Sequence, residues 1–118
     1  MLVAETGYVR AQLKDNVIIA RVLCPNITHL EHQILQTQIS ELCSKYGHRV
    51  VLDLTEVHLI GSSGLSTFIA LNKDISAAKG AFAICCMKED LVQLLKMTHL
   101  IKLFKIYPTT AAAVEAIK

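Results

Sequence analysis

The chain has 118 residues, of which 53% are hydrophobic and 19% are charged, so it has the size and composition of one folded domain and not of a disordered chain. Its formal net charge of +2 comes from basic and acidic residues mixed along the sequence, which argues against the basic stripe of a nucleic-acid-binding protein. The longest apolar run, 81–87, is the length of a strand and far short of the roughly 20 residues that cross a membrane.

The N-terminus lacks the basic segment and apolar core of a signal peptide, and we expect a cytoplasmic protein. The four cysteines, Cys24, Cys43, Cys85 and Cys86, are expected to be reduced and to pack as small hydrophobic residues. Cys85 and Cys86 are adjacent in a predicted strand. Their side chains should therefore point to opposite faces and should not bind one metal ion together.

The first predicted elements form a hairpin. Tyr8–Lys14 alternates in part between polar and apolar residues, and Val17–Leu23 is a β-branched apolar run, so both are expected strands. Asp15 and Asn16 between them are typical turn residues.

A helix should follow the hairpin. Thr28 and Glu31 have the spacing of a capping box, which places the start of the helix, and Gly47 should end it in a left-handed turn after Tyr46. The expected buried face has helical spacing and consists of Leu35, Ile39, Leu42 and Tyr46.

The middle of the chain predicts a buried strand and a second helix. Arg49–Leu54 is almost continuously apolar, as in a strand of a parallel sheet, and Asp53 near its end should bond the amides of the next loop. The second helix should begin near Ser63 and be closed by Gly80. Its expected face consists of Leu65, Phe68, Ile69, Asn72 and Ile75.

The last third predicts a strand over Ala81–Met87, a helix over Lys88–Met97, a strand over Leu103–Tyr107 and a final helix capped by Thr109 or Thr110. The resulting order, β-β-α-β-α-β-α-β-α, predicts a single α/β domain over residues 1–118. It should have a mixed, mostly parallel sheet, about four helices packed against it and right-handed crossovers.

The segment Gly61–Gly64 is the most informative stretch for function. It lies between the carboxyl end of a strand and the start of a helix, where ligands and partners commonly bind in α/β sheets. Ser62 or Ser63 should cap the helix, and a phosphate on Ser62 would lie beside the positive helix end. The alternative is that the serines are ordinary caps and the glycines only permit the turn.

A family resemblance rests on this region. Val50–Val57 reads V-V-L-D-L-T-E-V and Ile60–Leu65 reads I-G-S-S-G-L. This resembles the signature of the STAS domain, in which a strand ending in V-L-D-L-S is followed by a loop and by D-S-S-G-L at the start of a helix. The similarity continues through Leu91–Leu95, Leu103–Tyr107 and the alanine-rich C-terminus, and covers about Tyr8 to Lys118.

The resemblance implies an anti-sigma factor antagonist. In such proteins the first serine of D-S-S-G, here Ser62, is phosphorylated by the anti-sigma factor, an ATP-dependent serine kinase. The unphosphorylated form binds the anti-sigma factor and frees the sigma factor, and a PP2C-type phosphatase reverses the modification. The expected partner-binding residues are Asn26, Gly61, Ser62, Ser63, Gly64, Leu65 and Ser66. A mean hydropathy of +0.43 also suggests an exposed apolar patch, to which Leu65 and Ser66 would contribute.

Two positions depart from the family pattern. Gly61 replaces the usual aspartate beside the phosphoacceptor, and Asn26 is the nearest polar residue where the family often has G-x-L-D. These departures keep open a second hypothesis, a scaffold or accessory subunit of a signalling or transport complex that is not switched at Ser62.

No catalytic motif supports an enzyme. The chain lacks a nucleophile elbow, a P-loop and a dinucleotide-binding glycine pattern, and we expect no cofactor. A third hypothesis, a small ligand or nucleotide bound at the helix start near Gly61, is therefore ranked last. His29 and His32 share a helix face, but no metal site is expected, and Lys102 and Lys105 should form a solvated edge.

Overall fold

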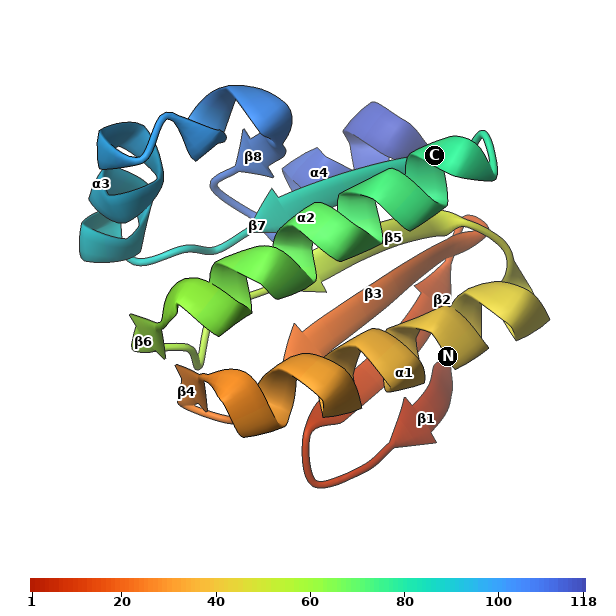
Figure 1. Cartoon of the computed structure of the whole chain (residues 1–118). Helices are drawn as coiled ribbons and strands as arrows, with labels where there is room; N and C mark the ends of the chain where they lie inside the picture. Colours follow the sequence, from red (N-terminus) through yellow and green to blue (C-terminus); the bar gives the residue numbers. More distant parts are fainter.

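A six-stranded sheet runs through the centre of the computed structural model, which describes residues 1–118 (Figure 1). In spatial order the strands are β1 (Leu2–Glu5), β2 (Val9–Lys14), β3 (Val17–Val22), β5 (Arg49–Asp53), β7 (Ala81–Cys85) and β8 (Lys105–Tyr107). The first three strands are antiparallel, and β3, β5, β7 and β8 are parallel. The predicted mixed, mostly parallel sheet is confirmed.

The structure contains four α-helices, as the sequence predicted. The first two, α1 (His29–Tyr46) and α2 (Ser62–Ala77), lie side by side on one face, and α4 (Thr110–Ile117) lies on the other (Figure 1). Between β7 and β8 the chain forms α3 (Glu89–Met97) and the short 3-10 helix η1 (Leu100–Leu103). A membrane-spanning helix is not found among them, since none combines the necessary length and hydrophobicity.

The alternation of side chains along each strand divides the interior into two cores. In β5, Val50 and Leu52 belong to the core beneath α1 and α2, whereas Val51 belongs to the core beneath α4. The first core contains 23 buried residues and the second only 7, so most of the hydrophobic stabilisation comes from the face covered by α1 and α2.

The hairpin and the first helix agree with their sequence signals. Asp15 and Asn16 have φ of 53° and 64°, and Lys14 pairs with Val17 on either side of this two-residue turn. The capping box of Thr28 and Glu31 is present at the start of α1. Gly47 ends the helix with φ of 102°, but its ψ of 172° is extended, so the predicted left-handed turn is not formed.

The start of α2 differs from expectation, whereas its end is closed by Gly80 as predicted. Gly61 is the N-cap and Ser62 is already the first helical residue, so the prediction that Ser62 or Ser63 caps the helix is wrong. At the other end Lys79 takes the left-handed conformation with φ of 62°, and the Gly80 amide bonds the Ile75 carbonyl at 2.8 Å. This is a Schellman motif, in which Gly80 follows the left-handed residue.

The buried face of α2 is rotated from the one predicted. Thr67 and Leu71 are buried, whereas Ile69 is exposed and Asn72 is half-buried. The reason is that α2 packs against α1 as well as the sheet, and His32 Nδ1 of α1 lies 2.6 Å from Thr67 Oγ1.

The prediction for the adjacent cysteines is wrong. Strand β7 ends at Cys85, short of the predicted Met87, because Cys86 has φ of 65° and leaves the extended conformation. The two side chains therefore do not alternate, and their Sγ atoms lie 3.1 Å apart.

The structure also contains elements that the sequence did not predict. Strand β1 extends the hairpin, and a separate two-stranded parallel sheet joins β4 (Asn26–Ile27) to β6 (Leu59–Ile60). The predicted strand over Leu103–Tyr107 begins only at Lys105, because Leu103 belongs to η1.

Gly64 fixes how closely α2 approaches the small sheet of β4 and β6. A Cβ atom at Gly64 would lie 2.7 Å from both the Ile27 carbonyl oxygen and the Ile60 Cγ2. We therefore expect Gly64→Ala to lower the free energy of unfolding by about 1–3 kcal/mol, measured by urea denaturation. Gly61→Ala is the matched control, because its nearest neighbour would be at an ordinary 3.7 Å. Equal stability of the two variants would contradict this account of the packing.

Candidate functional site

The small sheet of β4 and β6 brings the predicted partner-binding residues to one corner of the molecule. Asn26 pairs with Leu59 and Ile27 pairs with Ile60, and the Gly61 amide bonds the Ile27 carbonyl at 2.9 Å. Strands β4 and β6 lie together beside the first turns of α1 and α2 (Figure 1). Asn26, which is distant in sequence, thus lies in the same corner as Gly61–Ser66.

Among the serines of this corner, only Ser62 is exposed and has a hydroxyl without an intramolecular hydrogen bond. It lies in the first turn of α2. Ser63 is half-buried, and its carbonyl accepts a bond from Thr67 Oγ1. Ser66 is exposed, but its hydroxyl donates to the Ser62 carbonyl at 3.2 Å.

The start of α2 has no side chain that offsets its positive end. Gly61 has no side-chain cap, and the first turn contains no acidic residue. The first amide that bonds within the helix is that of Leu65, which donates to the Gly61 carbonyl. The amides and the helix dipole therefore favour a negative charge at this position. This is the electrostatic consequence of Gly61 in place of an aspartate.

The start of α1 differs from that of α2 because it has its own carboxylate. Glu31 Oε1 accepts hydrogen bonds from the Thr28 amide at 2.8 Å and from the Thr28 hydroxyl at 2.6 Å. These hydrogen bonds lower the pKa of Glu31 below its usual value. Of the two helices that meet at the corner, only α1 has an acidic cap.

The apolar part of the corner differs from the predicted one. Leu65 is half-buried against the main core, but Leu30 and Leu59 are 64% and 54% exposed. Leu30 lies in the first turn of α1, and Leu59 lies opposite Asn26 in the small sheet. Sequence reasoning missed both residues. Leu30 could have been found, because it is an apolar residue that does not share the helical spacing of the buried face of α1.

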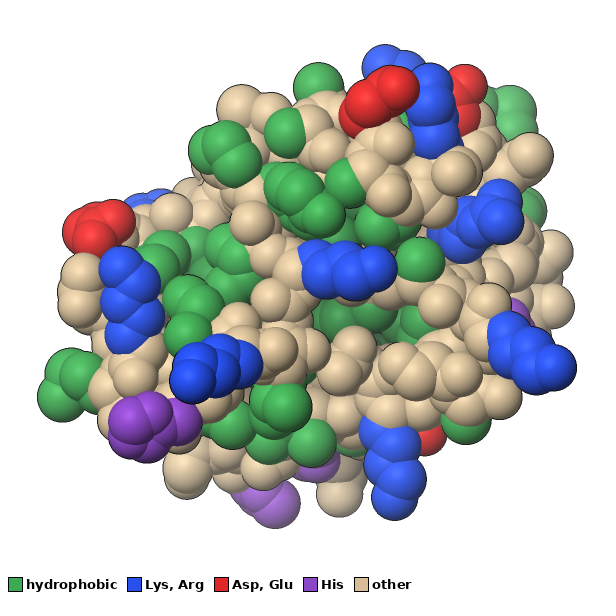
Figure 2. Space-filling model, turned by 90° about the horizontal axis from the view of Figure 1, so that it is seen from above, with side chains coloured by type: hydrophobic (Ala, Val, Ile, Leu, Met, Phe, Trp, Pro, Cys, Tyr) green, Lys and Arg blue, Asp and Glu red, His purple; other side chains and the backbone are tan.

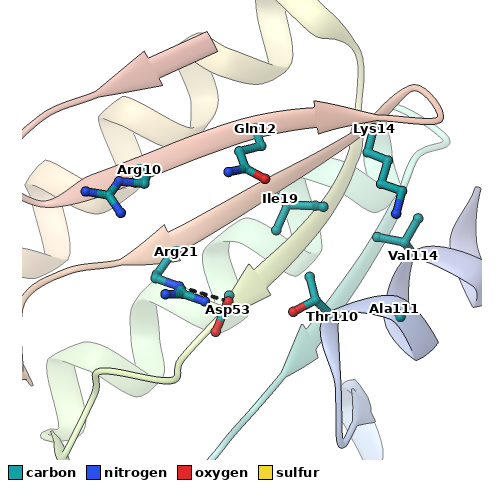
Figure 3. Close-up of a pocket in the computed structure, with 9 residues that line it drawn as sticks. All are labelled: Arg10, Gln12, Lys14, Ile19, Arg21, Asp53, Thr110, Ala111 and Val114. Carbon is teal, nitrogen blue, oxygen red and sulfur yellow. Dashed lines mark hydrogen bonds and ion pairs between the residues drawn. The ribbon is translucent and has the colours of Figure 1, made fainter. Parts of the chain in front are cut away.

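The opposite face of the sheet contains a groove of about 370 Å³ between β2, β3 and α4 (Figure 3). Arg10, Lys14 and Arg21 line it together with Asp53, and Figure 3 shows the Arg21 side chain directed at the Asp53 carboxylate. Arg21 Nε lies 3.1 Å from Asp53 Oδ2.

Asp53 lies at the end of β5 and bonds the following loop, as predicted. Its Oδ1 accepts from the Thr55 amide at 2.9 Å and from the Thr55 hydroxyl. Burial raises the pKa of Asp53, but the bonds from Thr55 and the charge of Arg21 together outweigh that effect and lower the pKa. Asp53 is therefore a buried, ionised side chain that is held by Thr55 on one carboxylate oxygen and by Arg21 on the other.

Charges on the surface formed by α3, β8 and α4 are dispersed. Figure 2 shows this face, on which lysine and arginine side chains lie singly among hydrophobic ones and form no continuous basic stripe. Lys102 and Lys105 are exposed, in agreement with the solvated edge that was predicted.

The family model described as the STAS domain matches residues 8–113, which is most of the chain. The chain belongs to the STAS domain family. A proposed anti-sigma factor antagonist of Thermotoga maritima is 29% identical over 87 residues, which cover 74% of this chain and 77% of that protein.

Two solved structures show the same STAS fold. The crystal structure of an anti-sigma factor antagonist from Mycobacterium paratuberculosis has a TM-score of 0.80 and 24% identity and covers 92% of each chain. The Bacillus cell fate determinant SpoIIAA in its phosphorylated form has a TM-score of 0.69 and 11% identity, over 93% of this chain and 99% of that one.

The lowered pKa of Glu31 predicts a pH-dependent contribution to stability. The contribution is present above the pKa of the unfolded chain, about 4.3, and is lost as the pH falls through the lower pKa of the folded state. Urea denaturation from neutral pH to pH 3 should therefore show the wild type more stable than Glu31→Gln at neutral pH, with the difference shrinking in acid. A difference that stays constant across this range would contradict the capping role of Glu31.

Proposed function

We propose that this STAS domain is a cytoplasmic anti-sigma factor antagonist that is switched by phosphorylation at Ser62. In this proposal it binds an anti-sigma factor that is also an ATP-dependent serine kinase, and a PP2C-type phosphatase restores the binding form. The chain acts by binding and not as an enzyme. The observation that carries the proposal is the exposed, unbonded Ser62 hydroxyl in the first turn of α2, within a domain whose relatives are named as anti-sigma factor antagonists.

The geometry of the corner supports Ser62 as the phosphoacceptor over its neighbours. A kinase needs the hydroxyl free and exposed, and Ser63 is half-buried while the Ser66 hydroxyl donates to a carbonyl. A phosphate on Ser62 carries a charge of about −1.5 to −2 and would lie beside free amides at the positive end of α2. The modification is therefore compatible with an intact helix.

The same charge explains how the modification would act on binding. The proposed contact surface consists of Asn26, Gly61, Ser62, Ser63, Gly64, Leu65 and Ser66, together with the exposed Leu30 and Leu59. Because apolar residues at an interface lose water on binding, a phosphate on Ser62 within this surface would have to be desolvated too. SpoIIAA, which shares the fold, has itself been solved in a phosphorylated form.

The phosphorylation site is tested by incubating the protein with ATP and the anti-sigma kinase encoded nearest to its gene. Intact mass should increase by one phosphate in the wild type and in Ser76→Ala, and should not change in Ser62→Ala. Ser76→Ala is the matched control, because Ser76 is an exposed serine of the same helix outside the proposed contact surface. Modification that persists in Ser62→Ala would refute the assignment.

A second candidate function is a scaffold that binds a partner without being switched, and Gly61 is the observation that favours it. Without an aspartate, the helix start lacks the carboxylate that the family places beside the acceptor hydroxyl. The scaffold hypothesis predicts that Ser62 is unmodified in cells and that Ser62→Ala has no effect. A phosphopeptide that contains Ser62, isolated from cells, would exclude it.

Gly61→Asp tests what the missing carboxylate does. The position has room, since a Cβ atom would have its nearest neighbour 3.7 Å away, and an aspartate there would cap α2 and lie at its positive end. We expect the free energy of unfolding to rise by about 0.3–1 kcal/mol. Urea denaturation of Gly61→Asp and of Gly61→Asn, whose side chains have the same shape, separates the effect of charge from that of capping. A Gly61→Asp variant less stable than the wild type would contradict the account of this helix start.

A further inference from the structure

The carboxyl ends of two central strands bring three metal-binding side chains together on the α4 face of the sheet. Asp53 of β5 pairs in register with Cys85 of β7, and Cys86 follows at the end of that strand. One carboxylate oxygen of Asp53 and the two sulfur atoms all lie within 4.8 Å of one another. This cluster is on the opposite face of the sheet from α2 and does not include Ser62.

The backbone of Cys86 is what places the second sulfur in the cluster. In a continuing strand its side chain would point away from that of Cys85, but φ of 65° turns it to the same side, and the Sγ atoms lie 3.1 Å apart. Such a conformation is uncommon for a residue that is not glycine, asparagine or aspartate. Strain of this kind is found at functional sites when the surroundings hold it in place.

We propose that Asp53, Cys85 and Cys86 bind a thiophilic divalent cation of the Zn²⁺ class. The two adjacent thiolates would chelate the ion, the Asp53 carboxylate would be the third ligand, and water would complete a four-coordinate site. Sulfur ligands disfavour Mg²⁺ and Ca²⁺, which prefer oxygen, so the ligand set itself selects the class of metal.

The distance between the two sulfur atoms requires only a small adjustment. In a tetrahedral site with Zn–S bonds of about 2.3 Å, two sulfur ligands lie about 3.8 Å apart. The Sγ atoms of Cys85 and Cys86 are 3.1 Å apart, so they need to separate by about 0.7 Å, which side-chain rotation can supply. The Thr110 hydroxyl lies 4.0 Å from Cys85 Sγ and 3.8 Å from Cys86 Sγ, close enough to bond a coordinated sulfur.

The charges of the site balance when a divalent ion is bound. Each thiol loses its proton to solvent on binding the metal, so the two sulfurs and the Asp53 carboxylate carry three negative charges. The ion supplies two positive charges, and the guanidinium of Arg21, bonded to Asp53 Oδ2 at 3.1 Å, supplies the third. No buried net charge remains.

The groove on the α4 face borders the proposed site. The groove of about 370 Å³ is lined by Asp53 and by Thr110, which contacts both sulfurs (Figure 3). Cys86 is half-buried, whereas Cys85 is buried, so an ion would reach the Cys86 sulfur first.

A disulfide between the two cysteines is disfavoured by chain geometry. Adjacent Cα atoms across a trans peptide are about 3.8 Å apart, and disulfides normally join Cα atoms about 4.4–6.8 Å apart. Metal chelation has no such requirement, because the ion lies between the two sulfurs.

The test is a titration of the reduced, metal-free full chain with Cd²⁺, followed by the ultraviolet charge-transfer absorption of thiolate–cadmium bonds. We expect one ion per chain, displaced by Zn²⁺. Affinity should fall at least tenfold in Cys86→Ala and several-fold in Asp53→Asn, and should be unchanged in the double control Cys24→Ala/Cys43→Ala. Circular dichroism establishes that each variant is folded.

The melting temperature gives an independent readout. Zn²⁺ should raise it in the wild type and in the double control, because the ion binds only the folded state, and should not raise it in Cys86→Ala. Absence of the charge-transfer band in the wild type, equal affinity in Cys86→Ala, or loss of binding in the double control would each overturn the proposal.

Discussion

The structure depends on three parallel strands, β3, β5 and β7. Strands β5 and β7 are buried on both faces, and β3 is buried on the face beneath α1 and α2. Because their side chains alternate between two cores, every second residue is fixed beneath α1 and α2 and the others beneath α4. A shift of one residue in the register would exchange the two sets, so the hydrophobic pattern also fixes the pairing. The three strands also end at the same edge of the sheet, which places the loops that follow them close together.

That shared edge explains why the two notable groups of residues both follow the ends of central strands and yet lie on different faces of the sheet. After β5 the chain passes through β6 to Gly61 and Ser62, and the small sheet with β4 holds this turn beside the start of α1. Asp53 and Cys85 lie at the ends of β5 and β7, but their positions in the alternation direct them toward α4. The proposed switch and the proposed metal site are thus built on the same strands, and neither requires the other.

Most of the fold was predictable because its signals are local. The capping box of Thr28 and Glu31, the Asp15-Asn16 turn and the apolar run of β5 each act within a few residues. The exposed position of Ile69 was not predictable, since it results from packing between α1 and α2 that depends on their final arrangement. Strands β4 and β6 have two residues each and are stabilised by pairing with one another, so neither has a periodicity to detect.

The candidate site shows the same division. The segment Gly61–Gly64 is recognisable in sequence. The pattern does not fix the residue at which the helix starts, and a difference of one residue decides whether Ser62 caps the helix or follows the cap. The convergence of Cys85 and Cys86 depends on the φ angle of a single residue, and a rule based on strand alternation necessarily gives the wrong answer. Leu59 was missed because its neighbour Asn26 is distant in the sequence.

The central claim is that Ser62 controls binding to an anti-sigma factor. The most direct measurement compares the affinity of the unmodified protein with that of the protein carrying phosphoserine at position 62 for the same purified anti-sigma factor. The account predicts binding that is at least tenfold weaker after phosphorylation, because the added charge lies within the contact surface on an otherwise unchanged helix. Equal affinity of the two forms, with the fold intact in both, would contradict it.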